Sequence, residues 1–388
     1  MNVLKVSNMY PSVSDPLDGI FIRDEILALR SKVSVTILTP RLWVPFFHPK
    51  FKPYNEQLPV DDFAKAFRYF SAPAWKLPKI AGKSISRGIT SELKNQRPDV
   101  LHLHGAFPCS LALPYLDLNR ISVVVTIHGS DWYKAIRFPG LKKLLLESLS
   151  LADAIVTVGD KLKKDIIEAA PKLGKTLYSI AHGIKTEQFP LCTDKKQAKQ
   201  KAGFDSEKKL LFTAANRLPE KGIDVYLRAI AENQVLRNTL VIIAGKKVDS
   251  DYEKYLQGII SENKLSNVTF FDTLDREQLI TYYHAADVYI QPSRSEGFGL
   301  AILEAACTGC PVVATKSGGP EQTVNRFMGL LAEADNRGSL AECIQKMLIS
   351  DDKNPEAIRN EVVKRFSIDE SVTKLLDLYT EIVSKNNA

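Results

Sequence analysis

The sequence predicts an α/β protein made of two doubly wound, Rossmann-like domains, and three observations carry this expectation. The chain has 388 residues, which exceeds the size at which a single hydrophobic core usually stops growing. Short, almost continuously apolar runs alternate with helical patterns, as in strands buried on both faces of a parallel sheet. These runs form two series, which are separated by a polar segment at residues 192–209.

The first series predicts the strands of an N-terminal sheet. Its runs are VLKVS, VSVTIL, VLHLH, VVVTIH and AIVTV, at residues 3–7, 33–38, 100–104, 123–128 and 154–158. The second series predicts a C-terminal sheet. Its runs are KLLFTAA, TLVIIAG, VTFFD, VYIQPS and PVVAT, at residues 209–215, 239–245, 268–272, 288–293 and 311–315.

The domain division is expected near residue 190, where the polar segment begins. This gives an N-terminal domain over residues 1–190 and a C-terminal domain over residues 191–366. The segment from Ser367 begins with a capping pattern and has apolar residues at helical spacing, so it predicts a final helix over residues 367–388.

The composition is that of a soluble globular protein, with 45% hydrophobic and 25% charged residues. No apolar run approaches the roughly 20 residues of a membrane span, and we expect a cytoplasmic protein. The net charge of +7 is uneven, because residues 1–185 carry 26 basic and 16 acidic side chains. Without a recognised binding motif, this basic half is weak evidence for nucleic acid, and no nucleic-acid partner is expected.

The stretch PSRSEGFGLAILEA, at residues 292–305, places Glu296 and Glu304 on either side of seven residues. The run VYIQPS ends just before Glu296, and LAILEAACTG predicts a helix closed by Gly309. EGFG is therefore expected to be a strand-to-helix turn whose glycines and helix-start N–H groups cradle an anion such as phosphate. A lone Gly-x-Gly turn is a weak signal by itself.

Glu304 lies within the predicted helix among small and apolar residues, where a carboxylate needs a partner. A ligand hydroxyl, a basic residue or a backbone N–H would each supply one. In AANRLPEKGID, at residues 214–224, Arg217 and Lys221 follow the end of a predicted strand. Two cations at this edge of a parallel sheet match a diphosphate, although solvated loop charges are the simpler alternative.

Taken together, NRLPEKG and SEGFGLAILEAACTGCPVVATKSGG, in this order, resemble the retaining glycosyltransferases of family 4, which have the GT-B fold and an E-x7-E signature. The segment KRFSID at residues 364–369 is similar to the family's terminal motif, after which a helix crosses back to the N-terminal domain. The resemblance covers most of the chain.

The resemblance implies a role for each residue of these motifs. Arg217 and Lys221 would hold the diphosphate of a nucleotide-sugar donor, and Glu304 would bind its ribose hydroxyls. Glu296 would hold the transferred sugar, together with the backbone of EGFG and the residue after it. The remaining donor-binding positions are Gly297, Phe298, Gly299 and Leu300.

In the N-terminal half, DPLDGIFIRDEI resembles the family's glycine-rich first loop, and TIHGSD resembles its His-Gly-x-Asp motif. Gly19 would then approach the donor phosphates or the acceptor, and His128 would reach the transferred sugar. The implied catalytic set is Glu296, His128, Arg217 and Lys221. One departure from the family pattern is Asp272, at a position that is often glycine.

No metal site is expected. His102 and His104 lack a third ligand and are assigned to strand-end packing, and Cys307 and Cys310 lack a second pair. The D-x-D at Asp249 and Asp251 follows a lysine pair in a polar loop and is interpreted as chance.

The function implied is metal-independent, retaining transfer of a sugar from a UDP- or GDP-sugar, with no cofactor. The acceptor would be a saccharide or a polyprenyl-linked saccharide in cell-surface polysaccharide or glycolipid synthesis. The alternatives are a nucleotide-sugar epimerase of the same architecture, or a non-catalytic partner subunit.

The segment at residues 40–87 interleaves nine Lys or Arg residues with aromatic side chains, among them Trp43, Phe46, Phe47, Phe51 and Trp75. This composition suits an anionic membrane surface, so the protein is expected to be cytoplasmic with a possible peripheral attachment to the inner face of the membrane. A loop-and-helix insertion with its aromatic residues in the core is the equal alternative.

Overall fold

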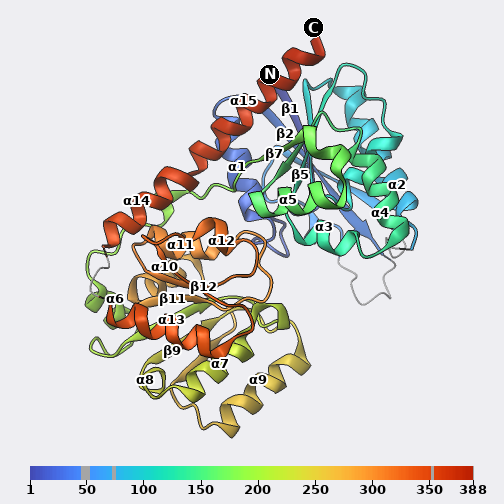
Figure 1. Cartoon of the computed structure of the whole chain (residues 1–388). Coiled ribbons are helices and arrows are strands. Elements are labelled where there is room, and N and C mark those ends of the chain that lie inside the picture. The colour runs from blue at the N-terminus through green and yellow to red at the C-terminus, as the bar shows by residue number, and fades with distance from the viewer. Residues whose placement is uncertain (45–52, 72–75, 351–353, 388) are drawn as a thin grey trace. The chain divides into compact units, whose positions relative to one another are not determined.

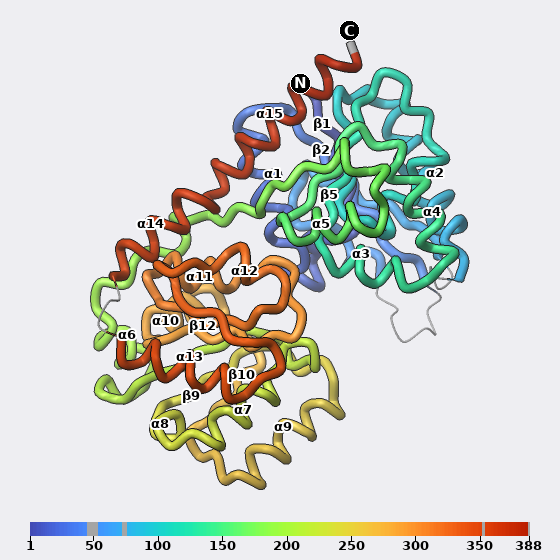
Figure 2. Tube along the Cα trace, viewed as in Figure 1, coloured from blue at the N-terminus to red at the C-terminus, as the bar shows by residue number. Residues whose placement is uncertain are grey.

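The computed structural model describes residues 1–44, 53–71, 76–350 and 354–387, and they form two compact units (Figure 1). The first unit is Met1–Gly183 with Ile368–Ala388, and the second unit is Ile184–Ser367. The chain therefore leaves the first unit at residue 183, and it returns there for its final helix, as the trace in Figure 2 shows.

The first unit is built on a seven-stranded parallel sheet in the order β3-β2-β1-β4-β5-β6-β7. Its strands are β1 Asn2–Ser7, β2 Ser34–Trp43, β3 Ala64–Phe70, β4 Val100–His104, β5 Ser122–Ile127, β6 Ala154–Thr157 and β7 Leu177–Ser179. Its helices are α1 Ile20–Arg30, α2 Pro78–Asn95, α3 Ser130–Ala135, α4 Pro139–Leu149, α5 Asp160–Ala169 and α15 Ile368–Asn387. The strand order reverses between β1 and β4, which makes their carboxyl ends the expected ligand-binding edge.

The second unit has a six-stranded parallel sheet in the order β10-β9-β8-β11-β12-β13. Its strands are β8 Leu210–Ala214, β9 Leu240–Ala244, β10 Val268–Phe271, β11 Val288–Gln291, β12 Val312–Thr315 and β13 Gly329–Ala332. Its helices are α6 Lys195–Lys201, α7 Ile223–Glu232, α8 Gln234–Arg237, α9 Ser250–Glu262, α10 Arg276–Ala285, α11 Leu300–Cys307, α12 Pro320–Thr323, α13 Arg337–Ile349 and α14 Pro355–Phe366. Here the order reverses between β8 and β11.

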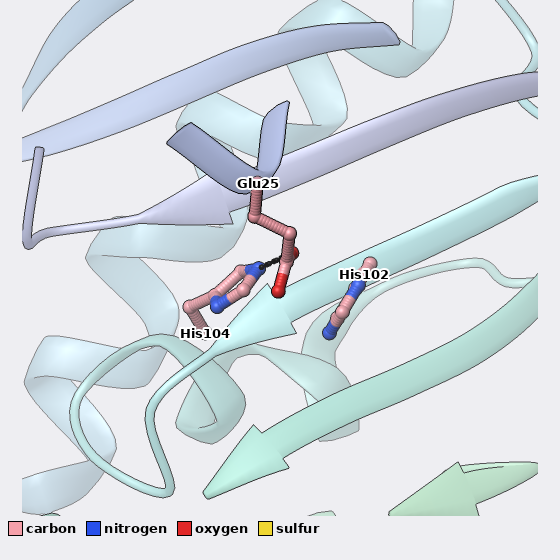
Figure 3. A group of neighbouring side chains, drawn as sticks. All are labelled: Glu25, His102 and His104. Atoms are coloured by element: carbon pink, nitrogen blue, oxygen red, sulfur yellow. Dashed lines mark ion pairs between the residues drawn. The ribbon is translucent and has the colours of Figure 1, made fainter. Parts of the chain in front are cut away.

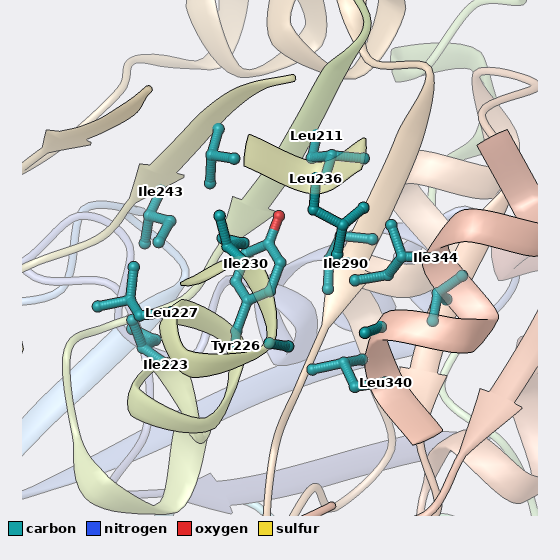
Figure 4. Packing of buried hydrophobic residues seen from close by; sticks show 14 of the residues in the cluster. Leu211, Ile223, Tyr226, Leu227, Ile230, Leu236, Ile243, Ile290, Leu340 and Ile344 are labelled. Atoms are coloured by element: carbon teal, nitrogen blue, oxygen red, sulfur yellow. The ribbon is translucent and has the colours of Figure 1, made fainter. Parts of the chain in front are cut away.

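Apolar side chains from both faces of the sheets explain why these elements form. In the second unit, Tyr226 on α7 is fully buried among aliphatic side chains of α7, α13 and the strands (Figure 4). In the first unit, α15 buries Val372, Leu375, Tyr379 and Ile382, at the three- and four-residue spacing of one helix face. This face packs beside α1, so the final helix belongs to the first unit.

The ten predicted strands are present, and β3, β7 and β13 were not predicted. Residues 40–87 contain the end of β2, then β3, and the first part of α2. Phe46, Phe47, Phe51 and Trp75 lie outside the described residues. Across the described ranges, no helix combines the length and the apolar character needed to cross a bilayer.

Candidate active site

The loops that follow β8 and β11 meet at the strand-order reversal of the second unit, and they bring Lys221 and Glu296 together. Lys221 Nζ donates to Glu296 Oε2 at 2.8 Å, across 75 residues of sequence. The same carboxylate oxygen accepts from Gln291 Nε2 at 3.2 Å and from Ser293 Oγ at 3.4 Å. The side chain of Lys221 is 24% exposed and that of Glu296 is 15% exposed, so both can be reached from solvent.

The EGFG turn is a strand-to-helix turn, as the sequence predicted. Gly299 is the N-cap of α11, with a φ of 91° in the left-handed region and no side-chain cap. Leu300 begins the helix, so the backbone N–H groups at its start are placed where an anion is favoured. These donors lie in the same turn as Gly297 and Glu296.

A neighbouring loop fixes the conformation of this turn. Glu296 N donates to Ser317 O at 3.0 Å, and Gly319 N donates to Glu296 O at 2.8 Å. A Cβ on Gly319 would lie 2.5 Å from Phe298 Cα, so no larger residue fits there. The Phe298 ring is 5% exposed and packs against Phe366, so only the backbone of this residue is available to a ligand.

Arg217 lies in the same region, but its guanidinium is fully engaged within the protein. The side chain is 2% exposed, and Nε donates to Glu253 Oε2 at 2.6 Å. Its terminal nitrogens donate to Gly245 O at 2.7 Å, to Phe271 O at 3.2 Å and to the carboxylate of Asp272. Arg217 therefore ties the ends of β9 and β10 and helix α9 to the loop that carries Lys221.

Asp272, which departs from the family pattern, supplies one of the two carboxylates that hold Arg217. To meet a diphosphate, the guanidinium would have to leave both of them. The structure thus brings Lys221 and Glu296 together at an accessible position, whereas the side chain of Arg217 is buried among its own partners.

Glu304, on the second turn of α11, has a side chain that is 21% exposed, and two residues of α10 contact it. Its Oε2 accepts from Tyr283 OH at 3.0 Å, and its Oε1 lies 3.7 Å from the guanidinium of Arg276. Arg276 also stacks over the Phe189 ring at 4.1 Å. Burial raises the pKa of the Tyr283 hydroxyl well above its usual value, so this hydroxyl remains a donor to Glu304. Sequence reasoning missed Arg276, which belongs to none of the motifs singled out and lies 28 residues from Glu304 in the sequence.

In the first unit, Gly19 is the N-cap of α1 and has a φ of 66°. A Cβ at this position would lie 2.5 Å from the Met9 carbonyl carbon, so close backbone packing as well as the positive φ requires glycine. The loop after β1 therefore runs directly against the start of α1, at the carboxyl edge of the sheet.

His128 follows β5 at the same edge. Its backbone N donates to Asp131, whose carboxylate also accepts from Ala106 N at 2.6 Å and so ties the β4 and β5 ends together. The His128 Nδ1 lies 3.1 Å from His182 Nε2. Burial, with a further contribution from the positive charge of Lys5, lowers the pKa of His128 to about 3, so the ring is neutral at physiological pH.

Glu25, His102 and His104 form a buried cluster whose ligand atoms lie within 4.8 Å of one another (Figure 3). The ammonium of Lys5, which is fully buried, pairs with Glu25 and lies 3.2 Å from His104 Nε2. Both nitrogens of His102 are engaged, with Tyr379 OH and Thr126 Oγ1. Glu25 is thus the third candidate ligand that was expected to be missing, and that part of the prediction was wrong. Because the ammonium of Lys5 already pairs with this carboxylate, the three residues do not fit a metal ion.

The other suspected metal ligands have structural roles. Asp249 is the N-cap of α9 and accepts from the backbone N of Asp251 and of Tyr252, both at 2.9 Å. Cys307 and Cys310 are buried free thiols near the end of α11. Cys307 Sγ lies 3.2 Å from the guanidinium of Arg359.

Two family models match this chain and together cover most of it. The model for glycosyl transferases group 1 matches residues 194–365, and the model for glycosyltransferase family 4 matches residues 20–188. TuaC of Bacillus subtilis, a glycosyltransferase named for teichuronic acid biosynthesis, is 23% identical over 366 residues, which are 89% of each chain.

Solved structures of GT-B glycosyltransferases share the fold. Sucrose-phosphate synthase from Thermosynechococcus elongatus superposes with a TM-score of 0.80 at 19% identity, over 99% of this chain and 100% of that one. Anabaena HepE, solved in complex with UDP and glucose, superposes with a TM-score of 0.72 at 16% identity, over 98% and 100% of the two chains. The protein described here is a glycosyltransferase enzyme with the GT-B fold, and it belongs to glycosyltransferase family 4.

Proposed function

We propose that this enzyme is a retaining glycosyltransferase that moves a sugar from a UDP- or GDP-sugar to a saccharide or a polyprenyl-linked saccharide. The second unit would bind the nucleoside diphosphate of the donor, and the first unit would bind the acceptor. The single observation that carries the proposal is the contact between Lys221 and Glu296 beside the uncapped start of α11. An ammonium and helix-start N–H groups suit a diphosphate, and an adjacent carboxylate suits the hydroxyl groups of a sugar.

The reaction would break the bond between the anomeric carbon and the diphosphate oxygen, and that oxygen would keep the electron pair. The acceptor hydroxyl oxygen would form the new bond on the same face of the sugar, and its proton would pass to the departing phosphate. Positive charge develops on the sugar and negative charge on the diphosphate, so fixed donors around the phosphates lower the barrier. Lys221 and the α11 backbone would supply these donors, and Glu296 would stabilise the sugar.

Within this scheme we assign Arg217 to holding the loop of Lys221 in place, and Glu304 to the ribose hydroxyls. Glu304 can be reached by such hydroxyl groups because its side chain is 21% exposed. No divalent ion is needed, because the protein's own cation and amides stabilise the leaving group. Activity in the presence of EDTA tests this point.

The acceptor is proposed from the chemistry of the first unit. Trp43 and Phe70, which are 42% and 47% exposed, contact each other with ring centroids 5.9 Å apart. On and before α2, the side chains of Lys76, Lys79 and Lys83 are exposed. Aromatic rings beside cations suit the headgroup region of an anionic membrane, where a lipid-linked saccharide would be presented. The peripheral, cytoplasmic location remains part of this proposal.

Liposome flotation tests the membrane contact. We expect the protein to float with anionic vesicles and not with neutral ones, and Lys79→Glu with Lys83→Glu should reduce the recovery. The matched control is Lys196→Glu with Lys201→Glu, two exposed lysines of α6 in the second unit. Equal recovery with neutral and anionic vesicles would remove the membrane from the proposal.

The catalytic proposal is tested with a panel of UDP- and GDP-sugars. Thermal shift should identify one nucleotide that stabilises the protein. Release of the nucleoside diphosphate should then depend on a saccharide or polyprenyl-linked acceptor, and NMR of the product should show the anomeric configuration of the donor. Interconversion of two sugar nucleotides without an acceptor would instead identify an epimerase.

A further inference from the structure

Four of the six histidines of the chain lie in one column of rings inside the first unit. The centroid distance is 4.4 Å from His102 to His104, 5.5 Å from His104 to His128 and 5.1 Å from His128 to His182. His102 and His104 lie on β4, and His128 and His182 follow β5 and β7. The column therefore runs across the carboxyl edge of the sheet and ends at His182, to which no role has been assigned above.

The last two rings of the column form a matched pair. Their planes are within 8° of each other, and His128 Nδ1 lies 3.1 Å from His182 Nε2. Phe21, the second residue of α1, packs against both rings, with centroid distances of 5.4 Å to His128 and 4.8 Å to His182. Phe21 and His182, from two other parts of the chain, thus hold the plane of the His128 ring.

The contact between the two nitrogens also couples the tautomers of the rings. Burial lowers the pKa of both histidines to about 3, so each ring carries one proton at physiological pH. A hydrogen bond between two such nitrogens requires one of them to donate and the other to accept. The two tautomers are therefore linked: if His182 Nε2 carries the proton and donates, His128 Nδ1 accepts and the proton of His128 lies on Nε2.

The other nitrogen of His128 is available to a ligand. Among the residues that the structure describes, His128 Nε2 is buried and has no hydrogen-bond partner. A buried polar atom without a partner costs free energy, and a ligand hydroxyl that reached it would remove that cost. Backbone contacts at Asp131 hold the main chain of His128, so the ring itself is left to His182 and its aromatic neighbours.

We propose that His182 is a positioning residue, which fixes the ring plane and the tautomer of His128 so that Nε2 meets a hydroxyl group of the transferred sugar. This inference rests on the proposed function, because the ligand is the sugar of the donor. His182 does not touch the sugar itself. It acts by holding His128 in one of its two neutral forms before the donor binds.

Two variants separate hydrogen bonding from packing. His182→Phe keeps an aromatic ring in the column and removes Nε2, whereas His182→Gln keeps an amide that can bond to His128 Nδ1. The matched control is His284→Phe on α10 in the second unit. It makes the same substitution at a histidine that is hydrogen-bonded to Pro190 O, whereas His128 belongs to the first unit.

The first measurement is the ¹H–¹⁵N NMR spectrum of the ring nitrogens in the free protein. We expect His128 of the wild type and of His182→Gln to show one predominant tautomer, and His128 of His182→Phe to show a mixture. A wild-type His128 that populates both tautomers equally would overturn the proposal without any variant. So would a His182→Phe spectrum in which His128 is unchanged.

The second measurement compares the affinity for UDP with that for UDP-glucose, and the affinity for GDP with that for GDP-mannose. His182→Phe should weaken the sugar nucleotide about three- to tenfold, the value of one lost hydrogen bond, and leave the nucleoside diphosphate unchanged. His182→Gln should recover most of the loss. Equal weakening of both ligands would show a merely structural role and contradict the proposal.

The two measurements keep the inference distinct from the function on which it rests. If the wild type binds none of these four ligands, the proposed donor is wrong, and the NMR spectra still decide whether His182 sets the tautomer of His128. If the ligands bind and the spectra show no coupling, the function stands and the role of His182 is wrong.

Discussion

Replacing Arg217 with methionine should destabilise the second unit rather than remove a diphosphate ligand. The guanidinium is 2% exposed, and it neutralises the buried carboxylate of Glu253 at 2.6 Å. Asp272 is 77% exposed at its side chain, so its loss of a partner costs little. Removing one partner of a buried ion pair typically costs about 3–5 kcal/mol, because it leaves the other charge uncompensated.

This cost translates into a measurable shift of the thermal transition. For a unit of this size, each kcal/mol lowers the melting temperature by about 2–4 °C, so Arg217→Met should lower it by about 6–20 °C. The assay is thermal or urea unfolding followed by circular dichroism. Adding Glu253→Met should restore much of the stability, because the buried carboxylate is then removed together with its cation.

The exposed pair Lys196 and Glu207 provides the control, and Lys196→Met should leave the transition unchanged. Below its transition, Arg217→Met should retain most of its affinity for the nucleotide. If instead the variant melts like the wild type and no longer binds nucleotide, Arg217 contacts the diphosphate directly, and the reasoning from its burial is refuted.

Three further changes test other parts of the account. Glu304→Gln should reduce the preference for a ribonucleotide over its 2′- or 3′-deoxy analogue in a titration, since a carboxylate accepts from ribose hydroxyls more strongly than an amide; a preference that is unchanged would remove Glu304 from the ribose. Asp249→Ala should destabilise α9 by about 0.5–2 kcal/mol, and Asp249→Asn should not, because asparagine also caps helices; activity that is lost in Asp249→Asn and depends on Mn²⁺ would show a metal site instead. Acid should destabilise the first unit, since burial lowers the pKa of His102 and His104 well below 6.5. As pH falls below about 6.5, the unfolded state binds protons that the folded state does not, so the free energy of unfolding should decrease by up to about 1.4 kcal/mol per pH unit for each such buried histidine; a flat denaturant midpoint between pH 7 and pH 5 would contradict this.

The sheet strands were predictable where burial on both faces leaves an almost unbroken apolar run. VVVTIH and TLVIIAG are of this type, and their strands are β5 and β9. β3 escaped prediction because AKAFRYF places Lys65 and Arg68 within the strand. β7 and β13 were missed because they have three and four residues, too few for a pattern.

The residues of the candidate site were predictable in part, because motifs report local sequence. The motifs after two predicted strands gave the positions of Lys221, Glu296 and Gly299. These residues follow β8 and β11, between which the strand order reverses. The carboxylates that hold Arg217 are 36 and 55 residues away from it in the sequence, and no motif near Arg217 indicates that they will contact it. His182 and His128 are 54 residues apart in the sequence, and they follow β7 and β5 of the same sheet. Their contact therefore depends on the strand order, which the sequence did not predict.

The most direct test of the central claim is a titration of UDP and GDP in EDTA, with the wild type and with Lys221→Met. The account predicts that one of the two nucleotides binds the wild type without divalent ions. In the variant, the loss of a charge-assisted contact worth about 1.5–3 kcal/mol should weaken that binding roughly 10- to 150-fold, with the fold retained. Binding that requires a divalent ion, or that Lys221→Met leaves unchanged, would contradict the account.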